Sequence, residues 1–253
     1  MKLVKDMKIL IVNDDSIAAP GIQVLARAAA QLGDVWVAAP DQQCSAMSQK
    51  LTLRELISLE AVADFPAPVR GAWRIGGTPV DCVKVALEFL LEEKPDVVLS
   101  GINNGFNCGQ DIAYSGTLGA AFEARRLGIP AIAFSAASDH YLAAMEPHLL
   151  PLLEELTGKQ PEPGSVWNVN FPAVKETRPL RGILRDREVC PVSMYREQYV
   201  PVEQENGRTW LECRGTPTPN HLIPEGTDAA AVRAGYISIG QVGCLYDVWE
   251  EEA

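Results

Sequence analysis

A segment rich in glycine and small polar residues runs from Val97 to Glu123. It begins with an apolar run, residues 97–99, and its loop ends at residues 115–117, just before small residues typical of a helix start. A buried strand that ends in such a loop and leads into a helix is a common layout for an anion site, because loop and helix N-terminal N–H groups attract negative charge. The side chains of Asn103 and Asn107 add hydrogen-bonding groups there without adding charge.

This loop matches neither of two common phosphate-binding patterns. Walker A requires a lysine followed by serine or threonine, and the loop contains no lysine. The dinucleotide fingerprint G-x-G-x-x-G is also absent, because Gly101, Gly105 and Gly109 are spaced by four. The plain alternative is a glycine-rich connector whose asparagines form their own turns. The loop alone leaves both interpretations open.

Two adjacent carboxylates, Asp14 and Asp15, directly follow the apolar run Lys8–Val12. Ser45 and Asn103 likewise come just past the carboxyl ends of predicted strands. Because ligands of parallel α/β sheets bind at that edge, we expect these four side chains to share a site. Mg²⁺ and Mn²⁺ prefer such oxygen ligands. A cap on the next helix is the structural alternative for either aspartate, but two neighbouring carboxylates favour a divalent cation.

The net charge of −11 argues against a broad nucleic-acid groove, which needs a basic stripe. An acidic protein that binds an anion needs a local positive source, and a metal ion or a helix N-terminus would supply it. The six cysteines form no C-x-x-C pattern, so free thiols are expected. We find no apolar run of membrane-spanning length and no signal-peptide pattern, and we therefore expect a cytoplasmic protein without a membrane partner.

The elements that must position these residues alternate between strand and helix. Strands are predicted at Lys8–Val12 and Asp34–Ala39, with a helix between them from Pro20 to Gly33. Leu51–Leu59 has partial period-two character and is interpreted as a strand or hairpin arm. Such an alternation predicts an α/β fold with a parallel sheet.

The next helix begins at Gly76–Asp81, where Thr78 is expected to be the N-cap. The remaining core elements are predicted as a helix at Leu118–Leu127, a strand at Ile129–Ser135, a helix at Tyr141–Thr157 interrupted at Pro147 and Pro151, and a last core strand at Val166–Phe171. The N-terminus of the helix after residue 117 would point at whatever residues 115–117 hold.

The pattern changes after Pro172. Short β-prone runs follow, including Ser193–Val200 and Thr209–Cys213, together with one short helix capped by Thr227 or Asp228. A segment so rich in loops and hairpins is hard to bury alone, so we expect it to pack on another subunit. We divide the chain into a metal- and phosphate-binding core, residues 1–172, and a C-terminal extension for oligomerisation, residues 173–253.

Several segments together resemble the SurE family of stationary-phase survival proteins, a family of metal-dependent nucleotidases. They are I-L-I-V-N-D-D (9–15), A-P-G-I (19–22), A-P-D-Q-Q-C-S (39–45), G-G-T-P-V-D-C-V (76–83), S-G-I-N-N-G-F-N-C-G (100–109), Y-S-G-T-L-G-A-A-F-E (114–123), N-V-N-F-P (168–172) and G-T-D (226–228). The resemblance covers most of the first 172 residues. It implies a Rossmann-like three-layer core with a mostly parallel sheet, and a β-rich C-terminal extension exchanged between subunits.

The resemblance also implies an activity and a site. The activity is that of a 5'-nucleotidase, in which a metal-activated water hydrolyses nucleoside monophosphates with one Mg²⁺ or Mn²⁺ per subunit. The family's metal ligands fall on Asp14, Asp15, Ser45 and Asn103, and its phosphate-contacting positions on Asn107, Ser115, Gly116 and Thr117. The catalytic residues are expected to be Asp14, Asp15 and Asn107. The implied partners are a small nucleotide and further copies of this chain, in a homodimer or homotetramer.

The chain departs from the family pattern in three places. Ser16 stands where glycine is usual, Cys44 where glutamine or a basic residue is usual, and residues 240–242 where threonine-proline-leucine is common. Two rival functions remain. A nucleotide-dependent transferase or oxidoreductase on a Rossmann core is disfavoured by the absent dinucleotide fingerprint. A non-catalytic nucleotide or phosphate sensor is disfavoured because all the proposed ligands are present.

Overall fold

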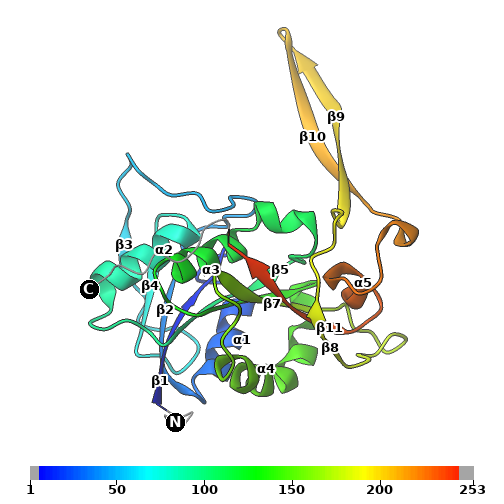
Figure 1. The fold of residues 1–253 in the computed structure, drawn as a ribbon. Helices are drawn as coiled ribbons and strands as arrows, with labels where there is room; N and C mark the ends of the chain where they lie inside the picture. Colours follow the sequence, from blue (N-terminus) through cyan, green and yellow to red (C-terminus); the bar gives the residue numbers. More distant parts are fainter. Residues whose placement is uncertain (1–5, 245–253) are drawn as a thin grey trace.

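A nine-stranded sheet forms the centre of the computed structural model, which describes residues 6–244 (Figure 1). The strands are β1 (Met7–Val12), β2 (Gly33–Pro40), β3 (Leu59–Ala61), β4 (Gly71–Ile75), β5 (Val97–Asn104), β6 (Ala131–Ala136), β7 (Ser165–Phe171), β8 (Ile183–Arg187) and β11 (Ile237–Gly243), in the sheet order β3-β4-β2-β1-β5-β6-β7-β11-β8. The six strands from β4 to β7 in this order are parallel, whereas β3 and β11 run antiparallel to their neighbours β4 and β7. The predicted α/β fold with a mostly parallel sheet is confirmed.

Helices cover both faces of the sheet and complete three layers. Helices α1 (Pro20–Ala29) and α4 (Leu142–Thr157) pack on one face, and α2 (Pro79–Val85) and α3 (Gly116–Arg126) pack on the other (Figure 1). Alternate residues of β1 enter the two cores, Ile9 and Ile11 on one side and Leu10 and Val12 on the other. No helix within residues 6–244 is long and apolar enough to cross a membrane.

The helix starts are set by local side chains. Thr78 caps α2, since its hydroxyl accepts from Asp81 N at 3.2 Å while the Asp81 carboxylate accepts from Thr78 N at 2.8 Å. This reciprocal pair is a capping box, and the predicted N-cap Thr78 is confirmed. The helix expected at Leu118–Leu127 begins two residues earlier, at Gly116, because Ser115 is its N-cap.

Three details of the predicted elements are wrong. Helix α4 continues through Pro147 and Pro151. Both prolines lie on the exposed face of the helix, where water can hydrogen-bond the carbonyl groups one turn earlier that a proline cannot pair with. Leu51–Leu59 pairs with the sheet only from Leu59 onward, and the side chain of Leu56 is 100% exposed instead of packed. Strand β7 is not the last strand of the core, because β11 and β8 continue the sheet beyond it.

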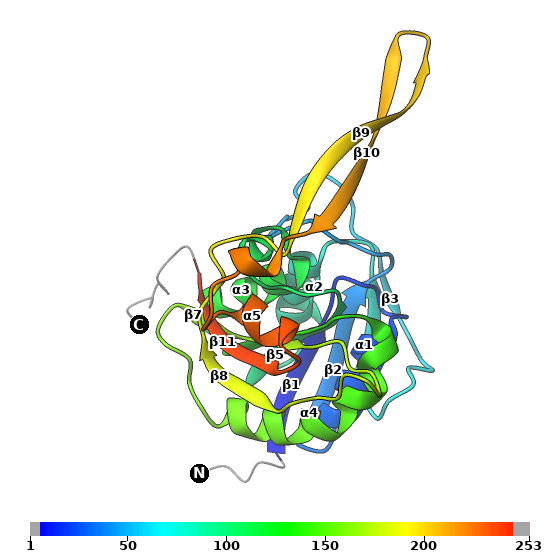
Figure 2. The same ribbon diagram turned by 90° about the vertical axis from the view of Figure 1, so that its right-hand side faces the viewer.

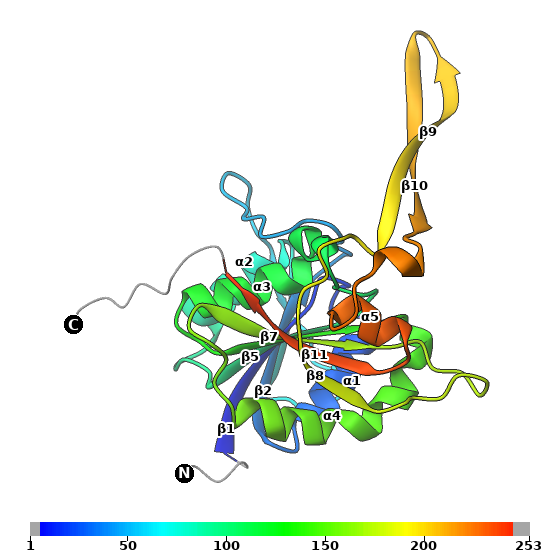
Figure 3. The ribbon, with the colours of Figure 1, turned by 45° about the vertical axis from the view of Figure 1, so that its right-hand side comes forward.

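Residues 173–244 therefore contribute in two ways. Strands β8 and β11 extend the main sheet, and helix α5 (Asp228–Arg233) packs against this end of it. Strands β9 (Tyr195–Glu205) and β10 (Arg208–Pro217) instead form an antiparallel hairpin that projects far from the body (Figures 2 and 3). The division at residue 172 stays a prediction, and residues 245–253 of the predicted extension lie outside the described residues.

Candidate metal and phosphate site

The predicted site lies at the carboxyl ends of three neighbouring strands. Strand β1 lies between β2 and β5 in the sheet, so the loops after β1 and β2 and the end of β5 come together at one edge. Asp14 and Asp15 follow β1, and Asn103 is the penultimate residue of β5. The N-terminus of α3 closes this edge, because Thr117 Oγ1 donates a 2.7 Å hydrogen bond to Asp14 Oδ1.

Asp14 is the most deeply placed acid of the site. Its side chain is 4% exposed, and burial raises the pKa of its carboxyl from 3.8 to about 7. The hydroxyl of Thr117 opposes this rise, and the charge of Asp15 adds to it. A Cβ on Gly116 would lie 3.0 Å from Asp14 Oδ2, so glycine lets the first turn of α3 approach the carboxylate.

Asp15 is less buried and is held by the backbone of β5. Its Oδ2 accepts a 2.7 Å hydrogen bond from Asn104 N, and its Oδ1 accepts from Gln43 Nε2 at 3.3 Å. Burial raises the pKa of this carboxyl too, and both hydrogen bonds oppose the rise. The Asn104 contact brings Asn103, the neighbouring residue, to the side of Asp15.

The remaining predicted ligands, Ser45 and Asn103, lie on either side of the aspartates. Cys44 N donates a 2.7 Å hydrogen bond to the backbone oxygen of Asp14, which places the exposed Ser45 at the mouth of the site. Asn103 Nδ2 donates to Gly105 O at 2.9 Å, so Oδ1 is the end of that amide suited to a cation. These contacts bring the four predicted ligands to one edge of the sheet.

The donor set fits a hard divalent cation. Neither Asp14 nor Asp15 forms an ion pair within residues 6–244, although Asp14 is buried and Asp15 is partly buried. A buried negative charge without a positive partner is costly, and a metal ion would relieve that cost. Across the same residues no three His, Cys, Asp or Glu side chains gather into a metal-binding group. Two carboxylates with neutral oxygen ligands suit Mg²⁺ or Mn²⁺, which retain bound waters.

The predicted phosphate contacts divide into two groups. Ser115, Gly116 and Thr117 form the start of α3 beside Asp14, where the helix N-terminus attracts anions. The Ser115 hydroxyl accepts a hydrogen bond from Leu118 N at 3.1 Å and so also caps the helix. Asn107 is 5% exposed and bonds to a different set of residues, with no hydrogen bond to either aspartate among the described contacts.

Several residues around the site were missed from the sequence. Gln43 and the backbone of Asn104 hold Asp15, while Ser135, Asn168 and Asn170 hold Asn107. Two asparagines in the buried strand motif N-V-N-F-P were a usable signal, since buried amides need hydrogen-bond partners. The contact of Asn104 runs through a main-chain N–H, which no residue type could indicate.

The departure from the family pattern at Ser16 changes the residue type at a turn with a positive φ. Ser16, which stands where the family usually has glycine, has a φ of 93°. That left-handed conformation suits glycine better than serine. The turn is held by Asn13 Nδ2, which donates to Ser16 O at 2.8 Å. The loop that carries Asp14 and Asp15 is therefore fixed even with a strained residue.

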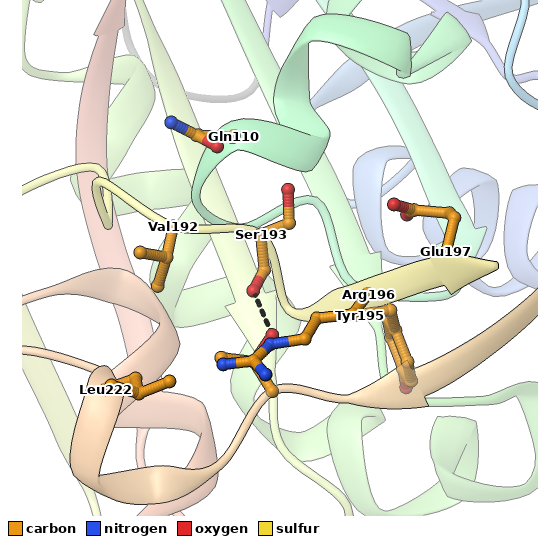
Figure 4. Close-up of a pocket in the computed structure, with 8 residues that line it drawn as sticks. Gln110, Val192, Ser193, Tyr195, Arg196, Glu197 and Leu222 are labelled. Atoms are coloured by element: carbon orange, nitrogen blue, oxygen red, sulfur yellow. Dashed lines mark hydrogen bonds between the residues drawn. The ribbon is translucent and has the colours of Figure 1, made fainter.

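A separate pocket of about 380 Å³ lies where the hairpin leaves the body (Figure 4). It is lined by Gln110, Val192, Ser193, Tyr195, Arg196, Glu197, Thr218 and Leu222, and none of the predicted site residues is among them. Thr218 Oγ1 donates to Ser193 O at 2.8 Å in its wall. The bridge between Gly109 and Ser193 joins this pocket to the loop that carries Asn107.

The fold is that of a three-layer α/β protein, a class in which ligands commonly bind at the carboxyl ends of the parallel strands, and the predicted site lies at that edge. The family model described as survival protein SurE matches residues 9–199. The chain belongs to the SurE family, which confirms the resemblance seen in the sequence.

Individual relatives match more than nine-tenths of the chain. The chain is 42% identical over 244 residues to the 5'-nucleotidase SurE of Gemmatimonas aurantiaca, covering 92% of this chain and 91% of that one. It is 38% identical over 233 residues to the 5'/3'-nucleotidase SurE of Edwardsiella ictaluri, with 92% and 88% covered. The crystal structure of the SurE protein of Aquifex aeolicus superimposes with a TM-score of 0.78 at 33% identity, covering 94% of each chain.

Proposed function

We propose that this protein is a metal-dependent nucleotidase that hydrolyses the phosphomonoester bond of nucleoside monophosphates and releases inorganic phosphate. Family membership and the nucleotidase names of its relatives support the activity. The observation that carries the proposal is the pair of neighbouring carboxylates, buried Asp14 and partly buried Asp15, beside the N-terminus of α3. Neither forms an ion pair among the described residues, and burial raises the pKa of both. A cation would complement the two carboxylates, and a phosphate group would complement the N-terminus of α3.

Asp14, Asp15, Ser45 and Asn103 would hold one Mg²⁺ or Mn²⁺ per subunit. When bound, the cation supplies positive charge that polarises a phosphoryl group and lowers the pKa of a water molecule. Thr117 holds Asp14 in place through its hydroxyl, and Asn104 and Gln43 hold Asp15. Fixing both carboxylates before the ligand arrives avoids an ordering cost on binding.

The phosphate group would bind against α3 and Asn107. The N–H groups of Gly116 and Thr117 belong to the first turn of an 11-residue helix and carry its partial positive charge. Asn107 and Ser115 add neutral hydrogen-bonding groups. Neutral donors and a helix terminus give a protein of net charge −11 a local attraction for an anion without a lysine in the loop. The same donors would stabilise charge that develops on the phosphoryl oxygens.

A panel of nucleotides tests the activity. Phosphate release would be measured from 5'- and 3'-nucleoside monophosphates with Mg²⁺, with Mn²⁺ and with chelator. We expect cation-dependent release that Asp14→Asn lowers by at least about 100-fold. The matched control is Asp34→Asn, the same change at the start of β2, where the carboxylate pairs with Arg70 on the surface. No release from any member, or release that persists in chelator, would contradict the proposal.

The oligomeric state and the cytoplasmic location also belong to the proposal. The hairpin exposes large apolar side chains, among them Tyr199, Val202, Trp210 and Leu211, each more than half exposed. Apolar surface presented on a projecting arm favours packing on another subunit. A homodimer or homotetramer would cover this surface.

A further inference from the structure

Four buried polar side chains meet beneath the loop that follows β5. They are Asn107, Ser135 on β6, and Asn168 and Asn170 on β7, and each is at most 5% exposed. Amide groups are costly to bury unless they are hydrogen-bonded, and an apolar set would fill the same space without that cost. A polar cluster at this depth therefore needs a reason beyond packing.

The amide of Asn170 pairs with both main-chain groups of Asn107. Asn107 N donates to Asn170 Oδ1 at 2.9 Å, and Asn170 Nδ2 donates to Asn107 O at 3.1 Å. Asn168 Nδ2 adds a second hydrogen bond to Asn107 O at 2.9 Å. The side chain of Asn170 thus binds the loop as a neighbouring strand would, and it fixes the main chain of Asn107.

Ser135 fixes the side chain of the same residue. Asn107 Nδ2 donates a 2.7 Å hydrogen bond to Ser135 Oγ. An amide nitrogen carries two hydrogens, and this bond occupies one of them. The orientation of the Asn107 amide is then determined before any ligand binds.

The strand spacing explains why both asparagines reach the loop. Asn168 and Asn170 are two residues apart on β7, so their side chains lie on the same face. Val169 between them enters the apolar core on the opposite face. The N-V-N spacing thus supplies two amides to the loop without interrupting the core.

We propose that Asn170 and Ser135 are positioning residues that hold Asn107 for contact with a bound phosphate group. This inference rests on the proposed function, because that function assigns Asn107 to the phosphate. Asn170 acts through the main chain of Asn107, and Ser135 acts through its side chain. Neither residue needs to touch the ligand itself.

A double-mutant cycle tests this coupling. Asn170→Ser and Ser135→Ala would each be made in the wild type and in Asn107→Ala, and binding of inorganic phosphate to the Mn²⁺-loaded protein would be measured by calorimetry. Binding of Mn²⁺ alone would be measured in parallel. Ser238→Ala is the matched control, because Ser238 is buried opposite Asn170 on β11 and its hydroxyl has no hydrogen-bond partner within residues 6–244.

We expect Asn170→Ser and Ser135→Ala each to weaken phosphate binding about tenfold when made in the wild-type background. In the Asn107→Ala background each should weaken it less than about twofold, because the effect passes through the Asn107 side chain. Mn²⁺ binding and the Ser238→Ala control should stay within about twofold of the wild type. Ser135→Ala removes only a hydroxyl, so it keeps the test valid if Asn170→Ser fails to fold.

Equal weakening of phosphate binding in both backgrounds would overturn the inference, since the variants would then act independently of Asn107. An unchanged phosphate affinity in Ser135→Ala and Asn170→Ser would overturn it as well. Phosphate that binds and couples as expected, in a protein that hydrolyses no nucleotide, would contradict the proposed function and leave the positioning of Asn107 supported.

Discussion

Asp14 has a negative charge that the protein alone does little to offset. Its carboxylate accepts one hydroxyl hydrogen bond from Thr117, and burial still raises its pKa to about 7. The neighbouring Asp15 adds to that rise. The raised pKa measures an electrostatic cost, which a divalent cation would remove and which removal of the carboxylate would also remove.

This cost predicts a pH dependence of stability in the absence of cation. The pKa of Asp14 is higher in the folded protein, about 7, than the ordinary value of 3.8, so the folded state binds the proton more tightly. The resulting stabilisation is complete below the ordinary value and is lost as pH rises through about 7. The wild type should lose about 1 kcal/mol of unfolding free energy from this group between about pH 6 and about pH 8.

Asp14→Asn should lack that loss and should be the more stable protein in chelator at about pH 8. Urea unfolding of both proteins at the two pH values measures the difference. If the unfolding free energy changed equally with pH in the two proteins, the electrostatic cost would not arise from the Asp14 carboxylate. Added Mn²⁺ should stabilise the wild type and leave the variant unchanged.

Ser16 offers a second prediction at the scale of one residue. Its φ of 93° is unfavourable for a residue with a Cβ, and Ser16→Gly would relieve this conformation. We expect a gain of up to about 1 kcal/mol in unfolding free energy, reduced by the larger entropy of glycine in the unfolded chain. Thermal unfolding measures it, with Ser138→Gly as the control because Ser138 has an extended φ of −173°. A loss of stability in Ser16→Gly as large as in the control would contradict this account.

At the scale of elements, Asp81 joins helix α2 to the loop that carries Ser45. Its Oδ2 accepts hydrogen bonds from Thr78 N and from Thr52 Oγ1, at 2.8 and 2.6 Å, and its Oδ1 accepts from Thr52 N at 3.1 Å. Thr78 Oγ1 in turn donates to Lys50 O at 2.6 Å. The capping box therefore also fixes residues 50–52, which lie shortly after Ser45.

Asp81→Ala should cost about 2–4 kcal/mol of unfolding free energy, because it leaves buried donors without a partner and removes a helix cap. Asp81→Asn keeps one acceptor oxygen and should cost less. Chemical unfolding of both variants tests the order. A cost below about 0.5 kcal/mol for Asp81→Ala would show that water replaces these contacts.

The sequence predicts those elements whose local signals agree with their packing. Pro20, the Thr78 cap and the apolar run before Asn13 fall where the structure places the ends of α1, α2 and β1. The prediction of a strand or hairpin arm from Leu51 is wrong because Leu51, Leu53 and Leu56 face solvent, and no strand of the described chain pairs with residues 51–58. Periodicity describes a face, and only tertiary contacts decide whether that face is covered.

The site shows the same limit. Residue types indicate the aspartates and the small polar loop. The hydrogen bonds from Asn104 N to Asp15 and between Asn107 and Asn170, however, join segments more than 60 residues apart. Such contacts depend on the sheet order, which places β5 beside β1 and β7 two strands from β5. That order is a property of the whole fold and cannot be deduced from one segment.

At the scale of the whole molecule, the hairpin is the least covered part of the described chain. Within residues 6–244, strands β9 and β10 pair only with each other, and β10 is exposed along its full length. A two-stranded hairpin is at best marginally stable alone in water. In the proposed oligomer, a second copy of the chain would supply the packing partner that this hairpin lacks among the described residues.

Light scattering tests this arrangement. We expect the wild type to have a mass of two or four chains of 27.5 kDa, and we expect Trp210→Lys combined with Leu211→Lys to lower that mass, because charges would replace the exposed apolar contacts. Lys substitution of Phe89, an exposed apolar residue on the body, is the control. A wild-type mass of one chain would exclude the proposed oligomer.

The most direct test of the shared site is anomalous diffraction from a crystal grown with Mn²⁺ and inorganic phosphate. The account predicts one manganese peak per subunit, coordinated by oxygens of Asp14, Asp15, Ser45 and Asn103. It also predicts phosphate between that peak and the start of α3. Manganese bound only elsewhere, or phosphate bound away from residues 115–117, would contradict the account.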